Sequence, residues 1–360
     1  MTTAAAQRKP IAVDPARVIA DPGYGEAFTE HLFSIDWSPE LGWHGAELKR
    51  LDNLSLHPAT LGLHYGQVIF EGLKAHRRVD GTVAAFRPED HARRFQRSAR
   101  RLAMPELPEE IFTGAIEQLI ERDGGMLSDD PTHCVYLRPI MFATDVTLML
   151  RPSNGYRFLL MAFVAAGFFG DDVESVSAWV SHDYVRAFPG GTGNVKVAGN
   201  YAGSFAAQRQ AQEAGCPQVL WLDATERKWI EEMGGMNIFF VRGEGPGARV
   251  VTPQLTGTLL PGVTRDTILA LAEGLGYTAS EERVSLAQWK SECEQGVITE
   301  VFACGTAAVV TPVKSIQDTG REWVIGDGTP GPVTRSLHRA LVDLHHGVTE
   351  QPAARTATAS

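Results

Sequence analysis

One lysine stands in an unusual stretch of the sequence, residues 191–201, which reads GTGNVKVAGNY. The neighbours of Lys196 are the apolar residues Val195, Val197 and Ala198, and nearby glycines leave room for another molecule to approach the backbone. An ammonium group in such surroundings is costly unless it is paired, neutralised or used in a covalent bond. We therefore expect Lys196 to take part in chemistry.

A second candidate is a carboxylate in the segment WIEEM. If this segment is a strand, alternation places Ile230 and Glu232 on one face and Glu231 on the other, so that one of the two glutamates faces inward. Taken alone, the pattern favours an exposed hairpin edge with two solvated carboxylates. The two glycines that follow at once weaken that interpretation, because glycines after a strand let a flat ligand approach the backbone.

Two loops offer backbone amides to an anion. In LPGVTRDTIL, residues 260–269, a Pro-Gly turn precedes a helix that Thr264 can cap, and the free amides of the first turn would face a phosphate. A plain capped helix is the commoner explanation of such a stretch. In ACGTAAVV, Gly305 and Thr306 lie between two predicted strands and offer amides and one hydroxyl group.

Two arginines complete the candidate anion site. Arg94 lies in an arginine-rich helix, where we expect most of the arginines to form a solvated face. Arg138 lies inside the apolar strand YLRPIMF, where its guanidinium group needs a carboxylate partner or a ligand. A lysine, an inward carboxylate and anion holders together point to a cofactor with an aldehyde, a protonatable ring nitrogen and a phosphate. Pyridoxal phosphate has all three groups.

The elements that must hold these residues follow from the periodicity of the sequence. In the first half we expect a hairpin around Asp80-Gly81, helices over 88–104 and 113–123, and two antiparallel strands over 134–144 and 156–166. In the second half we expect one helix over 198–215, then strands, a helix after the Pro-Gly turn, and a strand–loop–strand unit over 297–313.

The predicted fold class is therefore α/β (α+β) with two domains. We assign residues 1–168 to a smaller N-terminal α/β domain, 169–178 to an interdomain loop and 179–345 to a larger cofactor-binding domain. Residues 346–360 form a tail of low apolar content that we expect to be disordered.

Composition excludes several classes of partner. The net charge of −10 argues against binding to nucleic acid or to an anionic membrane, so a small molecule is the expected ligand. The longest apolar run is too short to span a bilayer. The four cysteines are scattered and no metal-binding motif is present, so we expect no disulfide framework, no metal and a cytoplasmic location.

The motifs together resemble branched-chain amino acid aminotransferases of the pyridoxal-phosphate fold type IV class. The resemblance rests on these stretches, which stand in the order of that family and span nearly the whole chain: YGQVIFEGLKAHR, FRPEDHARRFQRSARRL, YLRPIMF, GTGNVKVAGNY, QVLWLD, EEMGGMNIFF, LPGVTRDTIL and EVFACGTAAVVTPV. It implies transfer of an amino group between leucine, isoleucine or valine and 2-oxoglutarate, in a homodimer.

The resemblance also implies a role for individual residues. Lys196 would form the Schiff base with the cofactor, Tyr201 would bond the phenolic oxygen, and Glu232 would pair with the ring nitrogen. The phosphate would be held by Arg94, Val263, Thr264 and Thr306. The substrate would be bound by Tyr24, Tyr65, Phe70, Tyr136, Arg138, Thr306 and Ala307, with Leu148 and Leu150 reaching in from the partner subunit and Arg138 and Tyr136 receiving the distal carboxylate of glutamate or 2-oxoglutarate.

The sequence departs from the family at two places. Ala308 and Thr311 stand where eukaryotic members carry a redox CxxC motif, so we expect no thiol regulation of that kind. Gly235 stands where some members carry threonine near the cofactor, so one hydroxyl group is missing.

Two alternatives remain open at the level of the sequence. An aminodeoxychorismate lyase or a D-amino acid aminotransferase would share the fold, but those relatives are shorter and lack the YLRP context. A binding protein that keeps only the scaffold is disfavoured by the intact Lys196, Tyr201 and Glu232.

Overall fold

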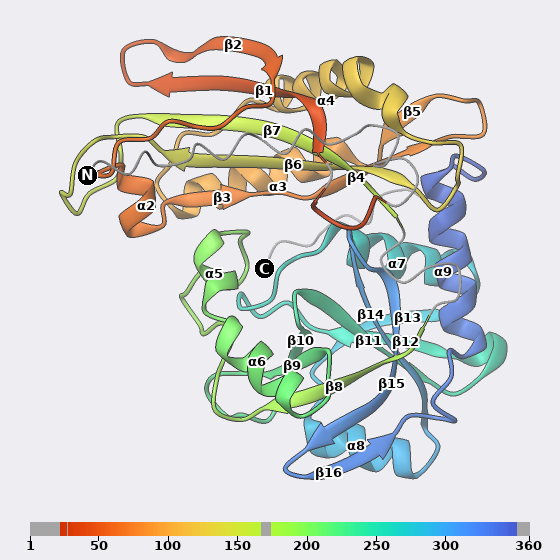
Figure 1. The fold of residues 1–360 in the computed structure, drawn as a ribbon. Helices are drawn as coiled ribbons and strands as arrows, with labels where there is room; N and C mark the ends of the chain where they lie inside the picture. Colours follow the sequence, from red (N-terminus) through yellow and green to blue (C-terminus); the bar gives the residue numbers. More distant parts are fainter. Residues whose placement is uncertain (1–21, 27, 167–173, 351–360) are drawn as a thin grey trace, which may run out of the picture.

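The chain folds around two β-sheets, each with helices packed against it (Figure 1). The computed structural model describes residues 22–26, 28–166 and 174–350. Figure 1 shows the two sheets one above the other, with α5 and α7 at the level where the two halves meet. The predicted two-domain α/β class is confirmed.

The first domain is built on an antiparallel sheet in the order β2-β1-β7-β6-β4-β5, with β3 beside β6. Its elements are β1 (Phe28–Ser38), β2 (Gly42–Arg50), α2 (Leu61–Tyr65), β3 (Val68–Phe70), β4 (Leu73–Arg77), β5 (Val83–Ala85), α3 (Pro88–Arg101), α4 (Glu109–Asp123), a 3-10 turn (Gly124–Met126), β6 (Cys134–Ala143) and β7 (Tyr156–Ala165). The hairpin around Asp80-Gly81, the two helices and the β6–β7 pair are confirmed. The apolar residues Ala92, Phe95 and Ala99 are buried against the sheet, as their helical spacing predicts.

The second domain is built on a mixed sheet in the order β10-β9-β8-β15-β14-β11-β12-β13, with β16 beside β15. Its elements are β8 (Val176–Ser181), α5 (Ala198–Ala202), α6 (Phe205–Glu213), β9 (Gln218–Leu222), β10 (Ile230–Met233), β11 (Met236–Arg242), a 3-10 turn (Gly245–Gly247), β12 (Arg249–Pro253), α7 (Val263–Gly274), β13 (Thr278–Glu282), α8 (Leu286–Glu294), β14 (Ile298–Gly305), β15 (Val309–Asp318), β16 (Arg321–Val324) and α9 (Pro332–His345). Apolar residues of α7 and α9, among them Ile268 and Leu337, pack on Phe239 and Phe302 of the sheet.

Two details of the predicted fold need correction, and most of a third lies outside the residues that the structure describes. Residues 176–178, which we assigned to the interdomain loop, lie in β8, because they pair in parallel with β15. The single helix expected over 198–215 is two helices, separated at Gly203 and Ser204, where the Ser204 hydroxyl donates a hydrogen bond of 2.7 Å to the Tyr201 carbonyl. Most of the predicted tail, residues 351–360, lies outside the described residues.

One face of α3 joins the first domain to the second. Arg87 pairs with Asp266 at 2.8 Å, the Arg94 guanidinium lies 3.4 Å from the Pro261 carbonyl, and the Ser98 hydroxyl accepts a 3.0 Å hydrogen bond from the Lys196 amide. Arg94 and Ser98 are about one turn apart on α3, so their side chains share one face, and Arg87 directly precedes the helix as its N-cap residue. The helix therefore places one row of polar groups along the lysine segment and the start of α7.

Candidate active site

The Lys196 side chain lies between the two domains. The Lys196 carbonyl accepts a 3.2 Å hydrogen bond from the Phe70 amide of β3, and the adjacent Val197 forms a bridge with Ile69. The ammonium nitrogen Nζ donates a 2.7 Å hydrogen bond to the Tyr201 hydroxyl, one turn into α5. It also lies 4.8 Å from the centroid of the Phe70 ring. The lysine is thus held by its backbone, while its amine faces a phenol and an aromatic ring.

Both glutamates of β10 are buried, so the expected exposed edge with solvated carboxylates is wrong. Glu231 is 4% exposed and Glu232 is 2% exposed. Strand β10 is not an edge open to water, because it pairs with both β9 and β11 and the segment 256–260 packs over it. The two side chains do alternate along the strand as predicted, because Glu231 and Glu232 enter different pockets.

Glu232 faces the pocket that also contains Tyr201, Gly235 and Leu260. One carboxylate oxygen, Oε1, accepts a 2.6 Å hydrogen bond from the Leu260 amide, and the other, Oε2, lies 3.0 Å from Nε of Arg186. Burial raises the pKa of Glu232, whereas the Arg186 guanidinium and the Leu260 amide act in the opposite direction. The carboxylate is therefore fixed in position on the lysine side of the strand.

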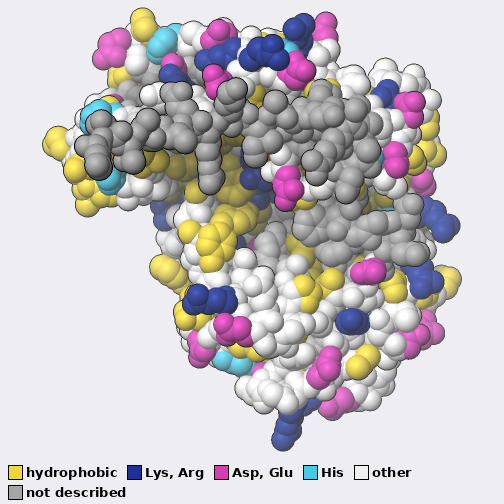
Figure 2. All heavy atoms as spheres, viewed as in Figure 1, with side chains coloured by type: hydrophobic (Ala, Val, Ile, Leu, Met, Phe, Trp, Pro, Cys, Tyr) yellow, Lys and Arg dark blue, Asp and Glu magenta, His cyan; other side chains and the backbone are white. Residues whose placement is uncertain are grey.

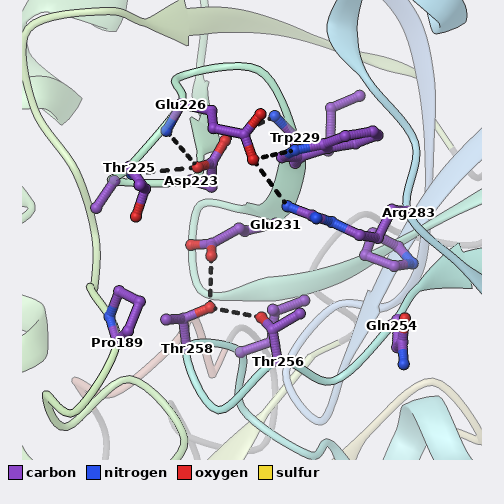
Figure 3. Close-up of a pocket in the computed structure, with 14 residues that line it drawn as sticks. Pro189, Asp223, Thr225, Glu226, Trp229, Glu231, Gln254, Thr256, Thr258 and Arg283 are labelled. Carbon is purple, nitrogen blue, oxygen red and sulfur yellow. Dashed lines mark hydrogen bonds and ion pairs between the residues drawn. The ribbon is translucent and has the colours of Figure 1, made fainter.

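Glu231 enters a separate pocket of about 180 Å³. Figure 3 shows its carboxylate among Thr258, Thr225 and Asp223, with a hydrogen bond to the Thr258 hydroxyl. Burial raises the pKa of Glu231. Tyr201, the hydrogen-bond partner of Lys196, lines the pocket of Glu232 and not that of Glu231, so Glu232 is the carboxylate on the side of the lysine site.

The start of α7 and Arg94 lie side by side and offer groups that can bind an anion. Gly262, and not Thr264, is the N-cap residue of α7, so the predicted capping role of Thr264 is wrong: the Pro-Gly turn already sets the extended backbone at Gly262, and Thr264 falls inside the helix. The first amides of a helix, here those of Val263 and Thr264, have no acceptor within the helix and can bind an anion. Arg94 is 4% exposed and its Nη1 atom lies 3.4 Å from the Pro261 carbonyl.

Thr306 and Ala307 lie in the turn between β14 and β15, as predicted. The Ala307 carbonyl accepts a 2.9 Å hydrogen bond from Nζ of Lys74, a buried residue of β4. Ala307 also packs against the buried cluster that includes Tyr136. The turn of the second domain is therefore attached to the first domain, next to the rings of Tyr24, Phe70 and Tyr136, which we call the aromatic wall.

That wall continues to Arg138. The Arg138 guanidinium lies 5.1 Å from the Phe70 ring centroid and 5.3 Å from that of Tyr136, whose ring is 5.4 Å from Tyr24. Its Nε atom is buried without a hydrogen-bond partner, and it forms no ion pair with any described residue. The residue is half-buried, and its Nη2 atom donates only a long 3.5 Å hydrogen bond to the Tyr136 hydroxyl, so the guanidinium is available to an anionic ligand.

The remaining predicted residues lie away from this cluster within the single chain. The Tyr65 hydroxyl donates a 2.7 Å hydrogen bond to the Leu148 carbonyl on the surface. Tyr65, Leu148 and Leu150 are 45%, 58% and 86% exposed. One chain alone therefore does not bring these three side chains to Lys196.

Three polar residues of the site were not predicted from the sequence. Glu71 is fully buried and pairs with Arg94, Arg186 pairs with Glu232, and Asn237 donates a 3.0 Å hydrogen bond to the Leu260 carbonyl. Glu71 and Arg186 each stand among apolar residues, in IFEGL and YVRAF, and that contrast is the signal that could have singled them out. Gly235 is not required for space, because an added Cβ atom would lie 3.7 Å from the Tyr201 ring.

The groups around Lys196 match the groups of pyridoxal phosphate. An amine can hold the aldehyde, the Tyr201 phenol the phenolic oxygen, and the Glu232 carboxylate a protonated ring nitrogen. Arg94 and the first amides of α7 supply donors for a phosphate. Among the described residues, no group of His, Cys, Asp and Glu is arranged to hold a metal ion, and no described helix is long and apolar enough to cross a membrane.

Comparisons with known proteins assign the chain to a family. The family described as Amino-transferase class IV matches residues 68–316. A branched-chain-amino-acid aminotransferase of Mycolicibacterium smegmatis is 50% identical over 92% of this chain and 90% of its own length. A probable branched-chain-amino-acid aminotransferase of Streptomyces coelicolor is 49% identical over 98% of both chains.

Solved structures agree with the sequence comparisons. The branched-chain amino acid aminotransferase of Escherichia coli has a TM-score of 0.74 at 28% identity and covers 89% of this chain and 96% of its own. A branched-chain amino acid aminotransferase from T.th., solved with pyridoxamine 5'-phosphate, has a TM-score of 0.72 at 27% identity and covers 90% and 96%. The chain therefore belongs to the pyridoxal-phosphate-dependent class IV aminotransferases and, within them, is a branched-chain amino acid aminotransferase.

Proposed function

We propose that the site around Lys196 transfers the amino group between leucine, isoleucine or valine and 2-oxoglutarate in two half-reactions. The observation that carries this proposal is the 2.7 Å hydrogen bond between Nζ of Lys196 and the Tyr201 hydroxyl, with Glu232 in the same pocket as Tyr201. The similarity to named branched-chain enzymes favours this reaction over that of a lyase or a D-amino acid aminotransferase of the same fold.

Each residue of the site has a distinct task. Pyridoxal phosphate, when bound, supplies an aldehyde that captures the amino group and a ring that withdraws electrons from the substrate Cα. Lys196 holds the cofactor at rest, and its amine then removes and returns protons as a general base and acid. Tyr201 orients that amine, and Glu232 would hold the ring nitrogen of the bound cofactor and stabilise a positive charge on it.

The two glutamates of β10 give a matched test of this assignment. Glu232→Gln should slow the half-reaction with leucine by about 100-fold or more, because a neutral amide does not stabilise a charged ring in a buried site. Glu231→Gln, on the other side of the strand, should change the rate by less than about threefold. Single-turnover absorbance changes of the cofactor measure both rates. Equal effects of the two variants would mean that Glu232 is not the partner of the ring nitrogen.

The aromatic wall supports a substrate pocket that accepts two kinds of side chain. Phe70, Tyr136 and Tyr24 offer apolar surface to a branched side chain, and Thr306 and Ala307 offer amides to the α-carboxylate. Arg138 stands between the rings of Phe70 and Tyr136 without a carboxylate partner among the described residues. We infer that it receives the distal carboxylate of glutamate and 2-oxoglutarate.

Arg138→Met should separate the two half-reactions. The variant keeps most of the apolar stem and loses the charge, so the step with 2-oxoglutarate should lose about 2 to 4 kcal/mol of transition-state stabilisation. The step with leucine should change much less, because leucine places only carbon there. Stopped-flow absorbance measures each step, with Arg157→Met, which removes a surface pair with Asp36, as the control. Equal losses in both steps would make Arg138 a structural residue.

We also propose that a homodimer completes the site. Tyr65, Leu63, Val146, Leu148, Met149 and Leu150 form an exposed apolar patch, which we call the α2 patch, and the bridge between Thr60 and Val146 places its two segments side by side. Figure 2 shows hydrophobic side chains gathered at the end of the molecule where α2 lies. Patches of this kind mark protein interfaces. A second copy seated there would bring Leu148 and Leu150 toward its neighbour's substrate pocket.

Charges placed in the α2 patch should separate the subunits. The double variant Leu148→Glu with Leu150→Glu should behave as a monomer in light scattering and lose most of its transaminase activity, because buried carboxylates oppose the contact. Leu41→Glu, which adds a charge to an equally exposed apolar residue in the β1–β2 turn, is the control and should stay dimeric. A double variant that remains a fully active dimer would exclude the α2 patch as the interface.

A cytoplasmic location is also a proposal. Its support is the state of the cysteines: all four, Cys134, Cys216, Cys293 and Cys304, are free, as expected of a protein from a reducing compartment.

A further inference from the structure

Glu71 is a buried carboxylate for which the reaction itself has no use. Its side chain is 0% exposed and lies between β3 and β4, where its backbone amide bonds to the Pro139 carbonyl at 2.8 Å. Two side chains of α3 converge on it: Arg94 through two hydrogen bonds of 2.7 and 2.8 Å, and Nδ1 of His91 at 2.9 Å. A carboxylate that has lost all its water must be held by such partners.

Burial and the neighbouring groups determine which side chains of this cluster are charged. Burial alone would raise the pKa of Glu71, but the Arg94 guanidinium and the His91 ring hold it well below its usual range, so the carboxylate stays ionised. Burial lowers the pKa of His91, so its ring is neutral at pH 7 and donates from Nδ1. The cluster is therefore one ion pair, Glu71 with Arg94, supported by a neutral histidine.

The ion pair fixes which part of Arg94 remains available. Its Nε and Nη2 atoms are both occupied by Glu71, whereas its Nη1 atom has only a long contact of 3.4 Å with the Pro261 carbonyl. Pro261 directly precedes the Gly262 N-cap of α7, where the amides of Val263 and Thr264 begin. The bidentate pairing with Glu71 fixes the orientation of the planar Arg94 guanidinium. In that orientation Nη1 points to the start of α7.

We propose that Glu71 is a positioning residue for the cofactor phosphate: by holding Nε and Nη2 of Arg94, it keeps Nη1 at the α7 amides. This inference rests on the proposed function, because it takes Arg94 and α7 as the phosphate site. Glu71 touches neither substrate nor cofactor in this account. Its effect should therefore be confined to ligands that carry a phosphate.

The test compares pyridoxal phosphate with pyridoxal, which lacks the phosphate, as ligands of the full-length chain freed of cofactor. In Glu71→Gln, the affinity for pyridoxal phosphate should fall about 10- to 100-fold, because Arg94 loses the carboxylate that binds it in a bidentate manner. The affinity for pyridoxal should stay within about threefold of wild type. Fluorescence titration gives both dissociation constants. Equal losses for the two ligands, or no loss for either, would overturn the proposal.

Glu300→Gln is the matched control. Glu300 is also buried, at 7% exposure, and it accepts hydrogen bonds from the Val333 and Thr334 amides at the start of α9. This variant removes a buried negative charge of the same size from a position outside the cofactor site. It should lower thermal stability and leave the ratio of the two affinities unchanged. A ratio that changes as much as in Glu71→Gln would assign the effect to general loosening and overturn the proposal.

A second variant covers the case in which Glu71→Gln fails to fold because Arg94 is left buried without a partner. Glu71→Asp keeps a negative charge beside Arg94 but is one methylene shorter, so it cannot reproduce the bidentate pairing. The proposal expects the affinity for pyridoxal phosphate to fall about threefold or more and the affinity for pyridoxal to stay unchanged. Equal losses for the two ligands, or no loss for either, would overturn it. A wild-type chain that binds pyridoxal as tightly as pyridoxal phosphate would instead contradict the phosphate site of the proposed function.

Discussion

The hydrogen bonds that tie the Lys196 backbone to the first domain are the contacts on which the rest of the site depends. The lysine belongs to the second domain, yet its carbonyl accepts from Phe70 of β3 and its amide donates to Ser98 of α3. These bonds fix the start of α5, which in turn places Tyr201 at the ammonium group. Because both domains hold the same short segment, the amine lies where the aromatic wall of one domain meets the carboxylate of the other.

Two ion pairs between residues that are distant in the sequence hold the charged groups around that amine. Glu71 holds Arg94 at one end of the site, and Arg186 lies against Glu232 at the other. Both carboxylates are buried, so each needs its guanidinium to remain ionised. Arg138 differs from these two arginines, because no described residue supplies its carboxylate. The site therefore contains two arginines that are paired by the protein and one, Arg138, whose carboxylate partner we propose to be the substrate.

Much of the fold and of the candidate site could be predicted from the sequence, and each prediction that failed has a physical reason. Periodicity located α3, β6 and β7 because their apolar residues face a core. It could not show that both Glu231 and Glu232 are buried, because the segment that covers β10 lies more than twenty residues further along the chain. The partner of Arg94 was missed for the same reason, since ion pairs between distant residues leave no local pattern. The roles given to Tyr65, Leu148 and Leu150 stay predictions, because one chain does not contain the contacts that would test them.

The central claim is that Lys196, one of seven lysines in the chain, carries the cofactor. It can be tested directly by reducing the cofactor-loaded protein with borohydride, digesting it and locating the phosphopyridoxyl group by mass spectrometry. We expect the group on Lys196 alone and no covalent label in Lys196→Ala. A label on Lys74, the buried lysine that donates to the Ala307 carbonyl, or a label that persists in Lys196→Ala, would contradict the account.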